Sequence, residues 1–168
     1  MFKLWGMVML WSSFAAAGLF ADKRLKARVK EIEKCILAVR IVEDELKHSL
    51  SPAGQIMEQL LENPLLRDFE FLHIYDSLKK SDITFNKALQ QAAKIFKGAL
   101  NEEDRAVFSQ LAFILGKSTA ESQLNAISAM LIKLEYQRCT ALEYEQKYGK
   151  MYRSLGMLGG AAVCLVLI

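Results

Sequence analysis

Both ends of the chain are apolar runs without a charged side chain. The first run, Leu4–Ala21, is 18 residues long and is preceded by one lysine. The second run, Ser154–Ile168, is 15 residues long. A helix that crosses a membrane needs about 20 mainly apolar residues. The two runs therefore predict an N-terminal transmembrane anchor over residues 1–21 and a C-terminal transmembrane segment over residues 154–168.

The second run is short for a membrane span. About 15 helical residues cover about 22 Å, whereas the hydrocarbon core of a bilayer is about 30 Å thick. Met151 and Tyr152 can extend the run, with Tyr152 at the interface and Lys150 and Arg153 reaching the headgroups. A span of this length is expected to thin the bilayer locally or to lean on a neighbouring helix.

The first run also has features of a cleaved signal peptide. Small residues around Ala15 and Ala17 offer a site that a signal peptidase accepts. Against this, basic residues follow the run directly: Lys23, Arg24, Lys26, Arg28 and Lys30. Positive charge on that flank opposes export and holds it in the cytoplasm. We therefore expect an anchor rather than a cleaved signal.

The same rule orients the second run. Basic residues precede it and no charged residue follows it: Lys133, Arg138, Lys147, Lys150 and Arg153. Because both inner flanks are basic, residues 22–153 are expected to form a cytoplasmic domain at a cell membrane, with both termini on the far side. The formal net charge is only +3, and the basic residues cluster beside the apolar runs. Anionic lipid headgroups are therefore the expected partner of these charges, rather than nucleic acid.

The middle of the chain predicts an all-α helical bundle. Apolar residues recur at helical spacing in two long stretches: Leu25, Val29, Ile32, Ile36 and Val39 in the first, and Leu124, Ile127, Leu131 and Leu134 in the second. No proline interrupts either stretch, so both helices are expected to continue into the terminal runs. Capping residues and prolines mark shorter helices between them, over roughly 52–62, 64–80, 84–99 and 101–115. The sequence thus predicts about six helices and no strand.

No group of residues in the sequence points to catalysis. His48 and His73 are far apart, and neither has a cysteine or carboxylate at ligand spacing. No glycine-rich loop follows a strand, so there is no phosphate-binding loop. Cys35, Cys139 and Cys164 have no metal-ligand spacing and are expected to act as small apolar side chains in a reducing cytoplasm. We expect no enzyme activity, no metal and no cofactor.

An acidic patch late in the first long helix is a candidate partner-binding surface. It consists of Glu43, Asp44 and Glu45. The alternative interpretation is an ordinary solvated face of the helix.

A stripe of small residues in the second run is a candidate packing surface. Gly156 and Gly160 are four residues apart, so they lie on one helix face, and Cys164 continues the stripe. Small residues let helices approach closely in a membrane. Matching small faces are present on the first run: Ser12 with Ala16, and Ser13 with Ala17. We expect the two runs to contact each other, with a second copy of the chain as the alternative partner.

Longer sequence features carry a resemblance to a known family. "FILGKSTAESQ" is followed by "LIKLEYQRCTALEYEQKYGKMYRSLGMLGG", a long helix with a Leu134–Glu135 pair and a Tyr, basic, Ser-Leu-Gly, apolar tail. Near the other end are Gly18, a basic start to the helix and "VEDELKHSLSP". Together these features resemble stage III sporulation protein AB of endospore-forming Firmicutes.

The resemblance implies a function that composition alone does not. That family is similar to the F protein of type II secretion and type IV pilus machines, a membrane platform with helical-bundle cytoplasmic domains. It implies a non-enzymatic scaffold of the channel between mother cell and forespore, in the outer forespore membrane. The implied partners are the cytoplasmic ATPase of the same operon, stage III sporulation protein AA, and the other proteins of the channel.

Two other classes of function stay open. One is a membrane-anchored enzyme or sensor whose active residues the sequence does not reveal. The other is a generic membrane-tethered helical adaptor or spacer. The short capped helices between the two long ones count against a simple spacer, which needs none of them.

Overall fold

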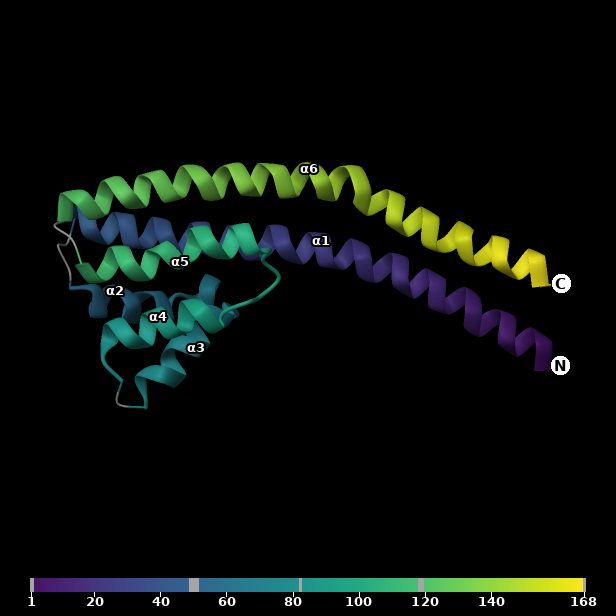
Figure 1. Cartoon of the computed structure of the whole chain (residues 1–168), viewed down its shortest axis with the longest axis horizontal. Helices are drawn as coiled ribbons and strands as arrows, with labels where there is room; N and C mark the ends of the chain where they lie inside the picture. The colour runs from purple at the N-terminus through teal and green to yellow at the C-terminus, as the bar shows by residue number, and fades with distance from the viewer. Residues whose placement is uncertain (1, 49–51, 82, 118–119, 168) are drawn as a thin grey trace. The chain divides into compact units, whose positions relative to one another are not determined.

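The structure is a computed structural model that describes the whole chain except residues 1, 49–51, 82, 118–119 and 168. The described residues form six α-helices and one short 3-10 helix, and no strand is present among them. The elements are α1 (Phe2–His48), α2 (Ala53–Glu62), the 3-10 helix η1 (Pro64–Leu66), α3 (Glu70–Lys79), α4 (Phe85–Ile95), α5 (Glu102–Lys117) and α6 (Ala120–Leu167) (Figure 1). The predicted all-α class and the number of helices are confirmed.

The chain forms two compact units. One consists of residues 1–29 with residues 139–168, and we call it the paired-helix unit. The other consists of residues 30–138, and we call it the bundle unit. Both α1 and α6 contribute to each unit, since neither helix is interrupted. The boundaries predicted at residues 21 and 153 refer to a membrane and stay predictions.

Among the described residues, no helix is sufficiently long and apolar to span a bilayer. The transmembrane segments predicted at residues 1–21 and 154–168 therefore find no support in the structure. The continuity of the two long helices into these runs is confirmed, because α1 contains all of Leu4–Ala21 and α6 extends from Ala120 to Leu167.

The single helix predicted over 64–80 is wrong, because the chain bends between η1 and α3. Phe69 has an extended conformation, with φ −89° and ψ 105°, and precedes the first residue of α3. Residues two apart on one helix point about 200° apart, so Phe69 and Phe71 could not both face the core of an unbroken helix. With the bend, both side chains are buried. Burial of two aromatic rings thus decides the local structure here.

The core of the bundle unit is built around four phenylalanines. Phe69, Phe71, Phe96 and Phe108 are each at most 2% exposed. Their ring centroids lie 5.0–5.9 Å apart, and most pairs meet edge to face, which is the favoured geometry for aromatic rings. Because α4 ends at Ile95 rather than at residue 99, Phe96 lies in an extended turn and its ring reaches this cluster. α4 packs on both α3 and α5.

The start of α5 is fixed by a reciprocal cap. The Asp104 backbone N–H donates to Asn101 Oδ1 at 2.7 Å, and the Asn101 backbone N–H donates to Asp104 Oδ2 at 3.2 Å. These bonds satisfy two donors that a helix start otherwise leaves without a partner. The cap positions Phe108 one turn beyond Asp104 on the same helix.

Candidate functional site

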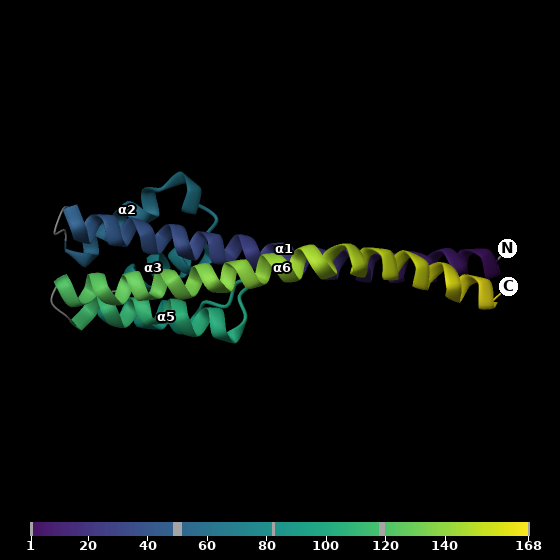
Figure 2. The same cartoon turned by 90° about the horizontal axis from the view of Figure 1, so that it is seen from above.

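In the paired-helix unit, glycines bring the backbones of α1 and α6 into close contact. The two segments run antiparallel and side by side (Figures 1 and 2). A Cβ atom on Gly156 would lie 2.8 Å from Phe14 O and 3.0 Å from Gly18 Cα. A Cβ atom on Gly18 would lie 2.5 Å from Tyr152 O. Real Cβ atoms do not approach backbone atoms this closely, so only glycine fits at Gly18 and Gly156.

Gly160 lies at the same contact, one turn further along α6. Its Cβ position is 2.9 Å from Trp11 Cδ1 and 3.3 Å from Phe14 Cβ. The residues on α1 that face the glycines are therefore Trp11, Phe14 and Gly18. Their spacing of three and four residues places all three on one side of the helix. The side chain of Cys164, which the sequence adds to this stripe, lies outside the described residues.

The small residues predicted on the other helix do not face the glycines. Ser12, Ser13, Ala16 and Ala17 are all exposed. The Ser12 hydroxyl donates to Met9 O at 2.9 Å, within its own helix. At about 100° per residue, positions 12, 13 and 16 lie on the far side of α1 from Phe14 and Gly18, and position 17 lies to one side of them. Two of the predicted packing residues, Gly156 and Gly160, thus lie at the contact, and the four on α1 lie outside it.

A polar pocket lies next to the glycine contact. It has a volume of about 480 Å³ and is lined by Asp22, Lys26, Glu145, Gln146, Lys150 and Arg153. We call it the polar pocket. Asp22 is buried, and its carboxylate lies 2.9 Å from Lys26 Nζ. Lys26 Nζ is also 4.0 Å from Glu145 Oε1. A Cβ atom on Gly149 would lie 2.6 Å from Asp22 Oδ1, so this glycine makes room for the buried carboxylate.

Many large apolar side chains of the paired-helix unit are exposed. All of the following are at least 40% exposed: Trp5, Met9, Trp11, Phe14, Leu19 and Phe20 on α1, and Leu155, Met157 and Leu158 on α6. On the polar side of this surface, Tyr144, Tyr148 and Tyr152 form a row with ring centroids 4.6 and 6.4 Å apart. An exposed apolar surface of this kind marks contact with a membrane or with another protein.

In the bundle unit, the acidic patch Glu43, Asp44 and Glu45 is only partly exposed to a binding partner. Glu43 Oε1 lies 2.9 Å from Lys47 Nζ and accepts a hydrogen bond from Ser128 Oγ at 2.9 Å. The hydrogen bond from Lys47, with that from Ser128, holds the pKa of Glu43 below its ordinary value. Asp44 is exposed, whereas Glu45 is half-buried. Glu43 therefore links α1 to α6, and Asp44 is the member of the patch that faces outward.

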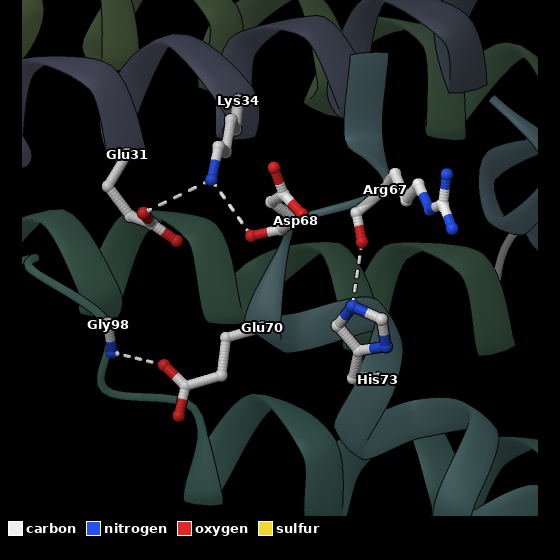
Figure 3. Close-up of polar contacts among 7 residues, drawn as sticks. All are labelled: Glu31, Lys34, Arg67, Asp68, Glu70, His73 and Gly98. Atoms are coloured by element: carbon white, nitrogen blue, oxygen red, sulfur yellow. Dashed lines mark hydrogen bonds and ion pairs between the residues drawn. The ribbon is translucent and has the colours of Figure 1, made fainter. Parts of the chain in front are cut away.

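A second polar cluster links α1 to the bend before α3, and links α3 to the turn after α4 (Figure 3). Lys34 Nζ donates to Asp68 O at 2.9 Å and lies 3.8 Å from Glu31 Oε2. The Gly98 backbone N–H donates to Glu70 Oε2 at 3.1 Å, and Gly98 has a left-handed φ of 49°. Burial raises the pKa of Glu31, opposed by Lys34 and reinforced by Glu70. These contacts hold elements of the bundle together.

The remaining titratable groups and cysteines of the described residues form no part of the clusters above. Within the described residues, no three His, Cys, Asp or Glu side chains are grouped closely enough to hold a metal ion. Cys35 is fully buried, and burial raises the pKa of its thiol well above the ordinary value, which keeps it protonated and unreactive. Cys139 is exposed and free. The expectation that the protein is not an enzyme stays a prediction.

The opposite pKa shifts of two glutamates predict opposite effects of neutralisation. Glu43→Gln should lower the free energy of unfolding of the full chain by about 1 kcal/mol at pH 7, the usual net contribution of one intramolecular hydrogen bond. Because the folded-state pKa of Glu43 is lowered, its contribution is present above the unfolded-state pKa. It is lost as the pH falls through the folded-state pKa. Thermal unfolding of wild type and variant between pH 3 and 7 measures this.

Glu31→Gln is the matched comparison. The folded-state pKa of Glu31 is raised, so ionisation of this group costs stability as the pH rises through that pKa. Replacement by glutamine removes this cost, and the variant should be at least as stable as wild type at pH 7. Equal destabilisation by the two substitutions would contradict the assignment of Glu43 as the paired carboxylate.

The comparisons with known proteins cover nearly the whole chain. The model of the stage III sporulation protein AB family matches residues 3–168. The chain is also 26% identical to stage III sporulation protein AB of Bacillus subtilis (strain 168), over all of both chains. No solved structure matches this chain.

Proposed function

Because the chain belongs to the stage III sporulation protein AB family, a family of sporulation proteins, we propose that it is a non-enzymatic platform of the channel between mother cell and forespore. In this proposal the paired-helix unit anchors the protein in the outer forespore membrane. The bundle unit lies in the mother-cell cytoplasm and contacts the ATPase stage III sporulation protein AA. The family match over residues 3–168 is the observation that carries the proposal.

Membrane anchoring is supported by the surface of the paired-helix unit. Its exposed apolar side chains come from the two terminal runs, and the row of tyrosines directly precedes the second run on α6. Tyrosine and tryptophan are enriched where a membrane protein passes through the interface. Insertion would bury this apolar area, which favours transfer into the bilayer by roughly 25 cal/mol per Å². In the same proposal the glycine contact holds the two helices together within the lipid.

The distribution of charge supports the same orientation. The paired-helix unit contains eight basic and three acidic residues, a net charge of +5, and the bundle unit contains fourteen basic and sixteen acidic residues, a net charge of −2. Basic flanks are retained on the cytoplasmic side of a membrane. An acidic bundle is repelled by anionic lipid, which favours its contact with protein partners rather than with the membrane surface.

The cytoplasmic position of the bundle unit predicts protection from an impermeant reagent. Lys97 is exposed on the turn after α4. A Lys97→Cys variant, with Cys139 and Cys164 replaced by serine, should not react with a membrane-impermeant maleimide in intact sporulating cells. After lysis it should react fully. The buried Cys35 gives little background. Labelling at position 97 before lysis would place the bundle on the other side of the membrane.

The contact with the ATPase predicts an effect of charge reversal at Asp44. Asp44→Lys changes the outward-facing member of the acidic patch and leaves the Glu43 contacts with Lys47 and Ser128 in place. Pull-down of the ATPase from sporulating cells should fall about tenfold, the usual size for loss of a charge pair at an interface. Glu62→Lys reverses another exposed carboxylate, at the end of α2, and should bind as wild type does.

The results also separate the alternative functions. Equal pull-down by wild type, Asp44→Lys and Glu62→Lys would remove the acidic patch from the contact. Absence of any ATPase in the wild-type pull-down, with the protein still in the membrane, would favour a generic helical adaptor or sensor over the ATPase platform. Stage-specific cross-linking to the other channel proteins is the corresponding test of the wider assembly.

A further inference from the structure

We propose that the polar pocket binds the phosphate of an anionic phospholipid headgroup and so fixes the depth of the paired-helix unit in the membrane. This inference rests on the proposed membrane location and adds a specific ligand class and residues to it. Three features of the pocket favour this ligand: its excess of positive charge, its position along the two helices, and the glycine that makes room in it.

The pocket contains more positive charge than its own carboxylates neutralise. Lys26 lies between the two acidic side chains, 2.9 Å from Asp22 Oδ2 and 4.0 Å from Glu145 Oε1. Lys150 and Arg153 line the same cavity, and no ion pair or hydrogen bond of their side chains is present within the described part of the chain. Three cations facing two carboxylates leave a net charge of +1. A phosphodiester monoanion balances this charge.

The two unpaired cations suit a phosphate group. A guanidinium binds phosphate oxygens through two parallel hydrogen bonds, and an ammonium adds a point charge from another direction. Arg153 and Lys150 are three residues apart on one helix, so both can reach one anion. Asp22 does not repel that anion strongly, because its side chain is only 8% exposed and its charge is held by Lys26.

The pocket lies at the boundary between the polar and the apolar parts of the unit. Contacts between α1 and α6 run in order from Lys26 with Glu145, through Asp22 with Gly149, to Gly18 with Gly156. Exposed apolar side chains lie beyond the pocket from Phe20 on α1 and from Leu155 on α6, and Met151, between Lys150 and Arg153, is also exposed. With the apolar part in hydrocarbon, Lys150 and Arg153 therefore lie at the level of the lipid phosphates. Basic pockets between helices on the cytoplasmic side are where anionic headgroups bind.

Gly149 allows the pocket to keep its shape. A Cβ atom at this position would lie 2.6 Å from Asp22 Oδ1 and 3.6 Å from Glu145 Oε1. A larger residue would push the Asp22 carboxylate away from Lys26 and into the cavity. Lys26 would then no longer neutralise Asp22, and the excess of positive charge that favours an anion would be lost.

The test uses the full-length protein in a neutral detergent and the short-chain lipid dioctanoyl phosphatidylglycerol. Binding is measured by native mass spectrometry and by titration, with dioctanoyl phosphatidylcholine as the zwitterionic comparison. Wild type should bind the anionic lipid about tenfold more tightly than the zwitterionic one. The double variant Lys150→Gln/Arg153→Gln should lose most of this preference.

A matched control separates the pocket from general basic charge. Lys23→Gln/Arg24→Gln removes one lysine and one arginine that are exposed in the same unit but do not line the pocket. It should bind phosphatidylglycerol within about twofold of wild type, because charges outside the site act only through a screened field. Equal weakening by both double variants would overturn the pocket proposal.

Two further experiments test whether the bound phosphate belongs to a lipid and whether the protein lies in the membrane. Inorganic phosphate at the same concentration should not compete with the lipid, and full competition would show a site for free phosphate and overturn the lipid assignment.

Membranes from sporulating cells are also extracted with alkaline carbonate. Release of wild type by carbonate would overturn the proposed function, and with it the lipid site. Retention of wild type, with unchanged lipid binding by Lys150→Gln/Arg153→Gln, would overturn the pocket alone.

Discussion

Replacement of Phe108 by alanine is expected to lower the free energy of unfolding by about 3–5 kcal/mol, the usual range for a buried phenylalanine. Phe108 is 1% exposed, and its ring centroid lies 5.0 Å from that of Phe71, 5.7 Å from Phe69 and 5.9 Å from Phe96. The substitution removes the one ring of the cluster that α5 contributes, and the three remaining rings would line the cavity. Loss of helical circular dichroism on heating or in urea, for the full chain in detergent, measures the effect.

A control for this substitution exists on the same helix. Phe113 is one and a half turns further along α5 and is 55% exposed. Phe113→Ala removes the same atoms and changes helix propensity in the same direction, but leaves no buried cavity. It should change stability by no more than about 0.5 kcal/mol. Similar losses for the two variants would mean that the phenylalanine cluster is not the core of the bundle unit.

The sequence predicted helices well where periodicity extends over many turns. α1 and α6 are uninterrupted in the structure as expected, because each has a long apolar stripe without proline. Periodicity failed between residues 64 and 80, where Phe69 and Phe71 both enter the core from a bent segment. That bend depends on the position of Phe96 and Phe108, which are far away in the sequence. The spacing of apolar residues between positions 64 and 80 therefore could not predict the bend.

In the candidate site, too, spacing along the sequence identified residues of one helix but not their partners on the other helix. Gly156 and Gly160 could be identified from their spacing alone, and both lie at the contact between α1 and α6. Their partners on α1 could not be identified by size, since Trp11 and Phe14 are large. Gly156 lies against the backbone of Phe14 and Gly18, and Gly160 lies against the side chains of Trp11 and Phe14. A search for small residues therefore selected the wrong sides of that helix.

The polar pocket was not predicted as a site, because its residues come from two parts of the chain more than a hundred residues apart. Lys150 and Arg153 were expected only to reach the headgroups. One signal was available in the sequence. Asp22 is a single acidic residue between an apolar run and a basic run, and its position opposite Gly149 becomes visible only once the antiparallel register of the two helices is known.

The glycine contact leads to the second large effect. Gly156→Leu is expected to destabilise the paired-helix unit by about 1–3 kcal/mol, the range for overpacking of a closely packed site. The added Cβ atom would lie 2.8 Å from Phe14 O and 3.0 Å from Gly18 Cα. Both neighbours are backbone atoms, so no side-chain rotation relieves the clash and the two helices must move apart.

Gly159→Leu is the matched control, because a Cβ atom there has nothing within 4 Å. It changes glycine to leucine three positions away in the same helix and should be neutral or slightly stabilising, since leucine favours a helix by somewhat under 1 kcal/mol relative to glycine.

Separation of the helices can be followed by cross-linking cysteines placed at Lys26 and Glu145, whose side-chain ends lie 4.0 Å apart. The yield should fall for Gly156→Leu and stay at the wild-type level for Gly159→Leu. Equal yields in all three proteins would show that pairing of α1 with α6 does not depend on backbone contact at Gly156. The pairing would then have to come from other contacts between α1 and α6, because Lys26 and Glu145 are replaced by cysteine in all three proteins.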